Sequence, residues 1–542
     1  MWLACESEPY YLTYPDSSGK FLQAAVFNQT GRPNIMKTSN HIHELIHCLS
    51  KGERRNFKLF SRLQEGDKMY DRLFDAIEKQ RKYDEPQLLK KFREDKFVKQ
   101  FSVAKNYLYN FILRTLHIFE KNPESDLKTL LNQVQILIEK NLFDHAEKLA
   151  RKARHIAERQ ECFTELLEVL GYQRQIYRNF NMRGELSSYV DDIQEAENEA
   201  FEKCGNLLQY QQIHDKIFRC LRESELARRP SELIIFDRIL SDPLVRNPGE
   251  SKSWNANLLR ISILRDCHHY AGAFDKCLTL TQEIISCYES NLDMLENFRL
   301  KYIMEIGNLA AFYYLCKENS HAADTLDKLR GLDISTIQER AKVLGRYYGM
   351  WMGIVIGSGD IAKGMQILEQ MTFDIREMRG KLNRGLEFHL YYYAAYFWQM
   401  AGEPSRALPW INLLLNRPRS EVRIDLQCFA RLLNLVIHYD LGNKDLVEHE
   451  CKSAYRFIHK RNRLYEVERR VLRFMQRAAS VSGEAEEKIA FQELRDDLLN
   501  LTKNPFELKA LNCFEFLDWT ESHLKGKTMA SLRDPSGEKV PG

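Results

Sequence analysis

A short turn followed by a small residue recurs along the second half of this chain, and this repeat constrains the fold more than any other feature. Each copy is a hexapeptide such as Gly272-Ala-Phe-Asp-Lys-Cys277, and an earlier copy ends at Ala146. Intervals of 46, 41, 43 and 40 residues separate the closing small residues Cys277, Ala323, Gly364, Ala407 and Val447. A unit repeated at this length is typical of stacked helix pairs. The sequence therefore predicts an all-α solenoid, a fold that presents surfaces and seldom carries chemistry.

Composition supports long helices and argues against several function classes. The chain has 25 glycines and 14 prolines in 542 residues, which together are about 7% of the chain. The average combined usage of these two residues is roughly 12%. Charged residues make up 29% but the net charge is only +3, so no global field attracts nucleic acid or a membrane. No apolar run approaches the roughly 18 residues of a membrane span. The N-terminus resembles no secretory signal, and the twelve cysteines lack CxxC pairs. These features predict a cytoplasmic protein without a cofactor.

Turn-forming residues divide the chain into five predicted parts. Residues 1–36 contain prolines and glycines without helical periodicity, which predicts a poorly structured extension. Residues 37–125 form a predicted helical N-terminal region, in which Ser50 and Glu53 have the spacing of a helix-capping box. Repeats follow over 126–504, then a capping helix over 505–528 and a disordered tail over 529–542. Because only neighbouring repeats touch in a solenoid, we expect a chain truncated near Pro418 to stay folded.

The repeats resemble tetratricopeptide (TPR) repeats. Tyr391, Ala395, Trp398 and Ala407 have the family's offsets, and Ala311, Tyr314 and Ala323 match part of them. The period here is nearer 43 than 34 residues, and Met352 occupies a position where the family has a small residue. Residues 49–60 and 73–77 also resemble the N-termini of large uncharacterised bacterial TPR-like proteins. The resemblance implies a right-handed α-solenoid of antiparallel helix pairs with a helical N-terminal cap, acting as a protein-interaction scaffold.

Aromatic residues on the predicted first helices mark the expected working surface. First helices line the concave side of such a solenoid, where a protein or peptide partner docks. Tyr and Trp are also the residues that dominate binding hot spots. We therefore predict a partner-binding surface over residues 300–400 formed by Tyr314, Tyr347, Trp351, Tyr392 and Tyr396. Lys301, Arg346 and Arg384 lie on or beside the same helices, where they are placed to meet acidic groups of a ligand.

Metal-ligating residues occur in two places, and neither has the context of a metal site. His43-Glu-Leu-Ile-His47 is a formal HExxH motif, and Glu65, 18 residues on, has the spacing of a third ligand in one class of zinc peptidase, which makes a zinc peptidase the weakest alternative function. No strand pattern precedes the motif, and Ile42, Leu45 and Ile46 fit an ordinary amphipathic helix. A second cluster, formed by Cys267, His268, His269 and Cys277, has no spacing that ensures tetrahedral closure. We predict no bound metal and no enzymatic activity.

An excess of positive charge in the N-terminal helical region supports the second alternative. Residues 51–105 contain 16 Lys and Arg against 10 Asp and Glu. A DNA-reading helix needs such an excess, which makes a transcriptional or signalling regulator with a TPR-like sensor region the runner-up interpretation. Acidic residues interleave with the basic ones, however, which favours a solvated surface or a cap. We expect nucleic acid and membranes not to be partners, and no motif names a small-molecule ligand.

Overall fold

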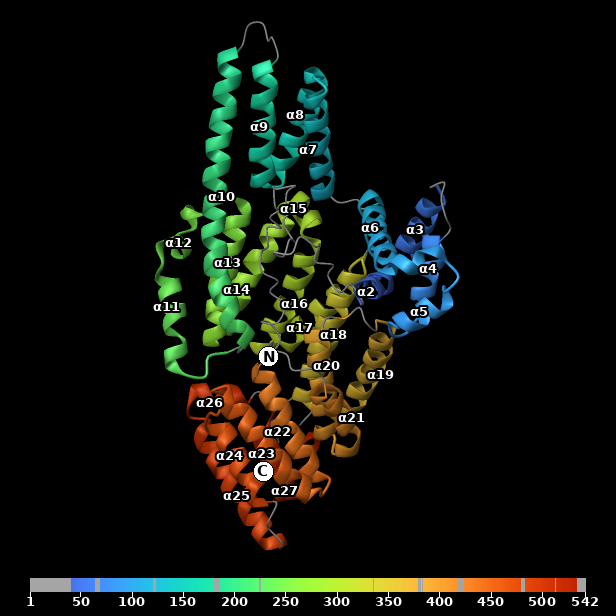
Figure 1. Ribbon diagram of the computed structural model, residues 1–542. Coiled ribbons are helices and arrows are strands. Elements are labelled where there is room, and N and C mark those ends of the chain that lie inside the picture. The colour runs from blue at the N-terminus through green and yellow to red at the C-terminus, as the bar shows by residue number, and fades with distance from the viewer. Residues whose placement is uncertain are drawn as a thin grey trace. The chain divides into compact units, whose positions relative to one another are not determined.

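The computed structural model consists mainly of helices over the residues that it describes (Figure 1). It describes residues 40–63, 69–119, 123–179, 186–223, 226–334, 336–378, 382, 384–416, 424–478, 483–511 and 513–533. Within these ranges no strand is present, which confirms the predicted all-α class. No helix in the same ranges combines the length and the apolar character needed to cross a bilayer. The predicted extension over 1–36 lies outside the described residues. The chain divides into two units, residues 40–201 and 202–533, each described separately below.

The first helices of unit 40–201 pack around one apolar cluster. The elements are α2 (His41–Cys48), α3 (Lys51–Leu63), α4 (Met69–Glu78), α5 (Glu85–Lys91), η1 (Lys96–Gln100) and α6 (Phe101–Phe119). Ser50 and Glu53 form the predicted capping box: the Ser50 amide donates to the Glu53 carboxylate at 2.6 Å, and the Glu53 amide donates to Ser50 Oγ at 3.2 Å. Phe57 stacks on Phe74 in the buried centre, with 4.5 Å between ring centroids.

Alanine allows the next helices of this unit to approach closely. They are α7 (Pro123–Glu139), α8 (Phe143–Arg159), α9 (Phe163–Asn179) and the start of α10 (Leu186–Glu223). The buried stripe of α8 consists entirely of fully buried alanines at helical spacing, namely Ala146, Ala150, Ala153 and Ala157. Since α8 contacts both α7 and α9, these small side chains let both neighbours pack near its backbone.

Unit 202–533 is built mainly from consecutive antiparallel helix pairs. It begins with the rest of α10, followed by η2 (Pro230–Glu232), α11 (Ile234–Ser241), α12 (Pro243–Arg246) and η3 (Pro248–Glu250). The pairs are α13 (Trp254–Ala271) with α14 (Phe274–Glu289), α16 (Arg299–Leu315) with α17 (Asn319–Arg330), α18 (Ile337–Ser358) with α19 (Ile361–Glu377), α20 (Arg384–Met400) with α21 (Pro404–Leu415), α22 (Ile424–Asp440) with α23 (Lys444–Lys460), and α24 (Glu466–Ala478) with α25 (Glu484–Leu501). A short helix, α15 (Leu292–Asn297), precedes α16.

A residue with positive φ ends the first helix of most pairs and sets the register of the second. In unit 202–533 these residues are Gly272, Lys317, Gly359, Gly402 and Gly442, and in unit 40–201 Asn141 has the same place between α7 and α8; their φ values lie between 59° and 86°. A fully or largely buried small residue follows five positions later in every case: Ala146, Cys277, Ala322, Gly364, Ala407 and Val447. The assignment of Ala323 to this position is therefore wrong by one residue. Lys317 adopts the left-handed conformation that glycine adopts in most other copies, and no glycine marks this turn in the sequence.

Arg228 closes unit 202–533 by joining segments that are far apart in sequence. Its guanidinium donates to both Glu468 oxygens at 2.9 and 3.2 Å, and to Glu507 Oε2 at 3.1 Å. Its Nε donates to the Phe506 carbonyl at 3.1 Å, and its charge lies 4.3 Å from the centre of the Tyr465 ring. The expectation that only neighbouring repeats touch is thus wrong, because α24 and the C-terminal residues pack against the segment that precedes α11.

The C-terminal end is more structured than the sequence predicts. In place of one capping helix over 505–528, the structure has α26 (Pro505–Leu511) and α27 (Phe516–Lys525), followed by η4 (Ala530–Leu532). The predicted disordered tail is wrong for residues 529–533, because Met529 is buried and Arg533 donates to the Gly357 carbonyl at 3.1 Å. We refer to residues 505–511 and 513–533 as the C-terminal segment. Residues 534–542 lie outside the described residues.

Candidate functional site

Two of the predicted partner-binding tyrosines are covered by the C-terminal segment. Tyr392 is fully buried, and its hydroxyl donates to the Cys513 carbonyl at 2.9 Å. Tyr396 is also buried; its hydroxyl accepts from the Glu515 amide at 3.0 Å, and its ring lies 4.8 Å from Phe514. The prediction that these rings face a partner does not hold in this structure, since the C-terminal segment covers both of them.

The other predicted binding residues have intramolecular contacts as well. Tyr314 donates to the Gly353 carbonyl at 3.0 Å, and burial raises its pKa to about 12. The buried Arg346 side chain packs against Gly307. Tyr347 is half-buried and its hydroxyl accepts from Arg330 at 3.1 Å.

Trp351 is largely buried as well, with the Lys363 ammonium 3.8 Å from its ring centre. Lys301 lies 4.5 Å from the Phe298 ring centre. Arg384 begins α20, but its side chain lies outside the described residues. The aromatic residues therefore contribute mainly to the interior, because contiguous residues of a first helix pack against neighbours on several sides.

The HExxH motif lies on α2, and its imidazoles contact backbone carbonyls. His43 Nε2 donates to the Gln80 carbonyl and His47 Nδ1 donates to the His43 carbonyl, both at 2.9 Å. The two ring centroids are 4.0 Å apart. Glu65 lies outside the described residues. Among the residues that the structure describes, no three His, Cys, Asp or Glu side chains come together as a metal site.

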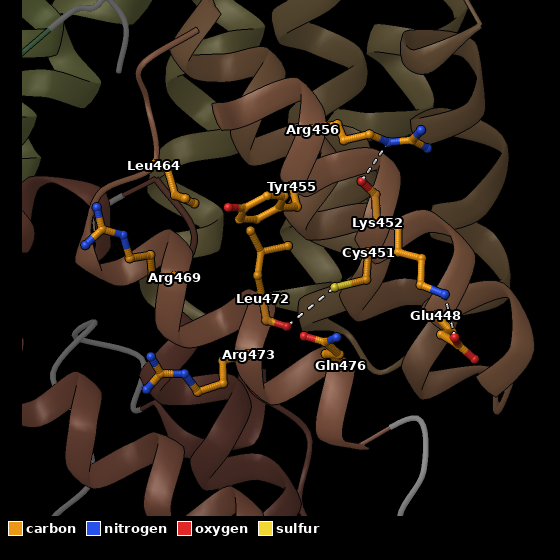
Figure 2. A pocket seen from close by; sticks show the side chains of 10 residues that line it. All are labelled: Glu448, Cys451, Lys452, Tyr455, Arg456, Leu464, Arg469, Leu472, Arg473 and Gln476. Carbon is orange, nitrogen blue, oxygen red and sulfur yellow. Dashed lines mark hydrogen bonds and ion pairs between the residues drawn. The ribbon is translucent and has the colours of Figure 1, made fainter. Parts of the chain in front are cut away.

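An open groove lies between α23 and α24, and we call it the α23–α24 groove. Its volume is about 720 Å³, within the usual range for ligand pockets. It is lined by Glu448, Cys451, Lys452, Tyr455, Arg456, Leu464, Arg469, Leu472, Arg473 and Gln476. Figure 2 shows Tyr455 and Leu472 in the middle of the groove, with Arg469 and Arg473 on one side and Lys452 and Arg456 on the other.

The floor of the groove is apolar and contains a thiol that is not activated. Cys451 is buried, and its Sγ donates to the Leu472 carbonyl at 3.4 Å. Burial raises the pKa of this thiol to about 11, so the thiolate, which is the nucleophilic form, is scarce near neutral pH. The groove therefore has the composition of a binding surface rather than of a nucleophilic site.

Positive charge dominates the rim. Four exposed cations line the groove against a single carboxylate, that of Glu448, which pairs with Lys452 at 2.7 Å. Arg469 pairs with Glu466 at 2.6 Å. Arg456 donates through Nε to the Lys452 carbonyl at 3.2 Å. Among the described residues, neither Arg456 nor Arg473 has a carboxylate partner, so both guanidiniums retain donors for an anionic ligand.

The groove was not predicted from the sequence, although the sequence contains a local signal for it. Lys452 and Arg456 are four residues apart on α23, and Arg469 and Arg473 are four apart on α24. Like charges at this spacing disfavour an isolated helix by roughly 0.2–0.5 kcal/mol per pair. Two such pairs on helices joined by one turn indicate a positively charged surface. That the pairs border one groove follows only from how α23 packs on α24.

No protein-family model, curated protein or solved structure matches this chain. The TPR resemblance accordingly stays a prediction from the repeat pattern, and the confirmed statement is the coarser one, an all-helical protein with recurrent helix pairs.

Proposed function

We propose that this protein is a TPR-like helical-repeat scaffold that binds an acidic segment of a protein partner in the α23–α24 groove. The interaction function and the right-handed α-solenoid are those that the repeat pattern implies. The partner docks in an open groove, because the aromatic residues of 300–400 are largely buried. The single observation that carries it is the groove itself, with four cations around an apolar floor and one carboxylate in its lining.

The chemistry of the groove favours an acidic peptide that also carries an apolar side chain. Arg456 and Arg473 have free donors for carboxylates, which arginine binds with two parallel hydrogen bonds. Tyr455, exposed at 47%, and Leu472 provide apolar surface between these cations. A peptide with alternating acidic and apolar residues would satisfy both parts of the groove.

Binding of a labelled peptide with alternating Glu and Leu residues tests this proposal by fluorescence anisotropy. Arg456→Glu combined with Arg473→Glu should weaken binding by at least about tenfold, equivalent to ~1.4 kcal/mol. The loss of peptide affinity in this variant should shrink as the salt concentration is raised, because interactions between exposed charges are screened beyond about 8 Å at physiological ionic strength.

A matched variant separates the groove from general electrostatics. Arg340 and Arg376 are also exposed and lie in the same unit, away from the groove lining. Reversing both should leave peptide affinity within about twofold, since screened distant charges contribute little. Equal losses in the two double variants, or no binding of the acidic peptide by the unaltered protein, would refute the groove as the docking site.

A further inference from the structure

A second basic cleft lies in unit 40–201, and the proposed scaffold function does not use it. It lies beside the turn between α4 and α5, has a volume of about 610 Å³, and we call it the α4–α5 cleft. Its lining is Ala76, Lys79, Gln80, Arg81, Lys82, Asp84, Gln87, Leu88, Lys90 and Lys91. We infer that the α4–α5 cleft is a binding site for a compact polyphosphate, such as inorganic triphosphate or the phosphate chain of a nucleotide.

The five cations of the cleft are left uncompensated because nearby acids pair elsewhere. Glu78 pairs with Arg54 at 3.0 Å and Asp75 with Lys58 at 2.9 Å. Glu85 pairs with the buried Lys105 at 2.5 Å, and Asp95 pairs with Arg72 at 3.1 Å. Each acid therefore neutralises a cation outside the cleft lining.

The only carboxylate in the lining also has a structural partner. Asp84 caps the start of α5 by accepting from the Gln87 amide at 2.9 Å. Among the described residues, no ion pair involves the five exposed cations Lys79, Arg81, Lys82, Lys90 and Lys91. Clustered cations in a concave site focus the field and attract anions.

A buried glutamine holds the loop that carries these cations. Gln80, 8% exposed, donates through Nε2 to the Asp84 carbonyl at 2.9 Å and to Gln87 Oε1 at 3.0 Å. Its Oε1 accepts from the Asp84 amide at 3.1 Å, and its backbone carbonyl accepts from His43 at 2.9 Å. The loop backbone is thus fixed before a ligand arrives, which lowers the entropy lost on binding.

The lining points to a compact ligand rather than to a nucleic acid strand. Single-stranded nucleic acid is bound by aromatic rings on which bases stack, and the cleft lining contains no aromatic residue. The nearby Tyr83 is engaged, because its hydroxyl donates to Glu85 at 2.9 Å and Lys105 lies 5.8 Å from its ring centre. Recognition in this cleft rests on charge, which suits a chain of phosphates with several negative charges in a small volume.

Isothermal titration calorimetry of the full chain with inorganic triphosphate tests this inference, with ATP and a short DNA duplex as parallel ligands. Triphosphate should bind, and ATP should bind if the phosphate chain alone is recognised. Arg81→Gln combined with Lys90→Gln should weaken triphosphate binding by about tenfold or more, since each removes one uncompensated charge from the cleft.

Lys96→Gln combined with Lys99→Gln is the matched control. Both lysines are exposed on η1, close in sequence but absent from the cleft lining, so triphosphate affinity should stay within about twofold. Circular dichroism melting of each variant establishes that it is folded. Absence of triphosphate binding, equal losses in both double variants, or binding of the duplex without triphosphate would each overturn the inference. None of these results bears on the acidic peptide, which is tested at a different groove.

Discussion

Replacing Arg228 with Met should destabilise unit 202–533 more than any exposed charge substitution. All three charged residues are shielded from solvent, since Arg228, Glu468 and Glu507 are 8%, 1% and 5% exposed. Burial disfavours the guanidinium charge, but Glu468 and Glu507 outweigh this effect and raise the pKa of Arg228 above its ordinary value. The Met variant would leave two buried carboxylates without their cation.

The expected cost follows from the burial of this cluster. Removing one partner of a buried ion pair costs roughly 3–5 kcal/mol, because the remaining charge is uncompensated. Glu507 keeps its bonds from the Val467 and Glu466 amides, at 3.1 and 3.3 Å, so most of the loss should arise at Glu468. With a urea m-value of about 3 kcal/mol/M, the unfolding midpoint should fall by about 1 M or more.

Tryptophan fluorescence during urea unfolding reports on this unit specifically. Five of the six tryptophans lie in it, at positions 254, 351, 398, 410 and 519. The double variant Arg228→Met with Glu468→Met also removes the unpaired carboxylate of Glu468. It should recover part of the lost stability, since apolar replacement of a buried ion pair is often close to neutral.

An exposed ion pair supplies the control. Arg477 and Glu493 are 54% and 57% exposed in their side chains, so Arg477→Met should cost about 1 kcal/mol or less. If Arg228→Met costs no more than this control, the closure around Arg228 contributes nothing beyond a surface contact and the reasoning is wrong.

Three further predictions concern packing, pH and truncation. Gly364→Ala should destabilise the protein by about 1–3 kcal/mol, because the added Cβ meets the Phe397 ring. Gly249→Ala is the control, because a Cβ at Gly249 meets open space. Equal melting temperatures of the two variants would contradict this packing. Burial lowers the pKa of Lys509 to about 8, whereas the unfolded chain keeps about 10.4, so the unfolded state binds more protons between these values. The free energy of unfolding should therefore rise from about pH 8 to about pH 10 in the wild type relative to Lys509→Gln, and parallel pH curves would exclude this shift. A chain ending at residue 418 should lose its cooperative fluorescence transition, because it lacks both carboxylates that bind Arg228. Retention of that transition would show that neighbouring repeats fold independently of the C-terminal end.

The repeating helix pairs are visible in the sequence because their causes are local. A left-handed residue ends a first helix and a small buried residue follows five positions later, and each depends on a few neighbouring side chains. The capping box at Ser50 and Glu53 was predicted for the same reason. One turn was placed a residue off, since Lys317 adopts there a conformation that glycine marks elsewhere.

The exposed surface and the closure of the unit were decided only by tertiary structure. Arg228 meets a carboxylate 240 positions away, and the run containing Tyr392 and Tyr396 has no local feature that shows the chain returning to cover it. The basic pairs on α23 and α24 likewise become one groove only when the helices pack. Periodicity reports which residues share a helix face, but burial depends on what packs against that face, and such partners come from distant parts of the chain.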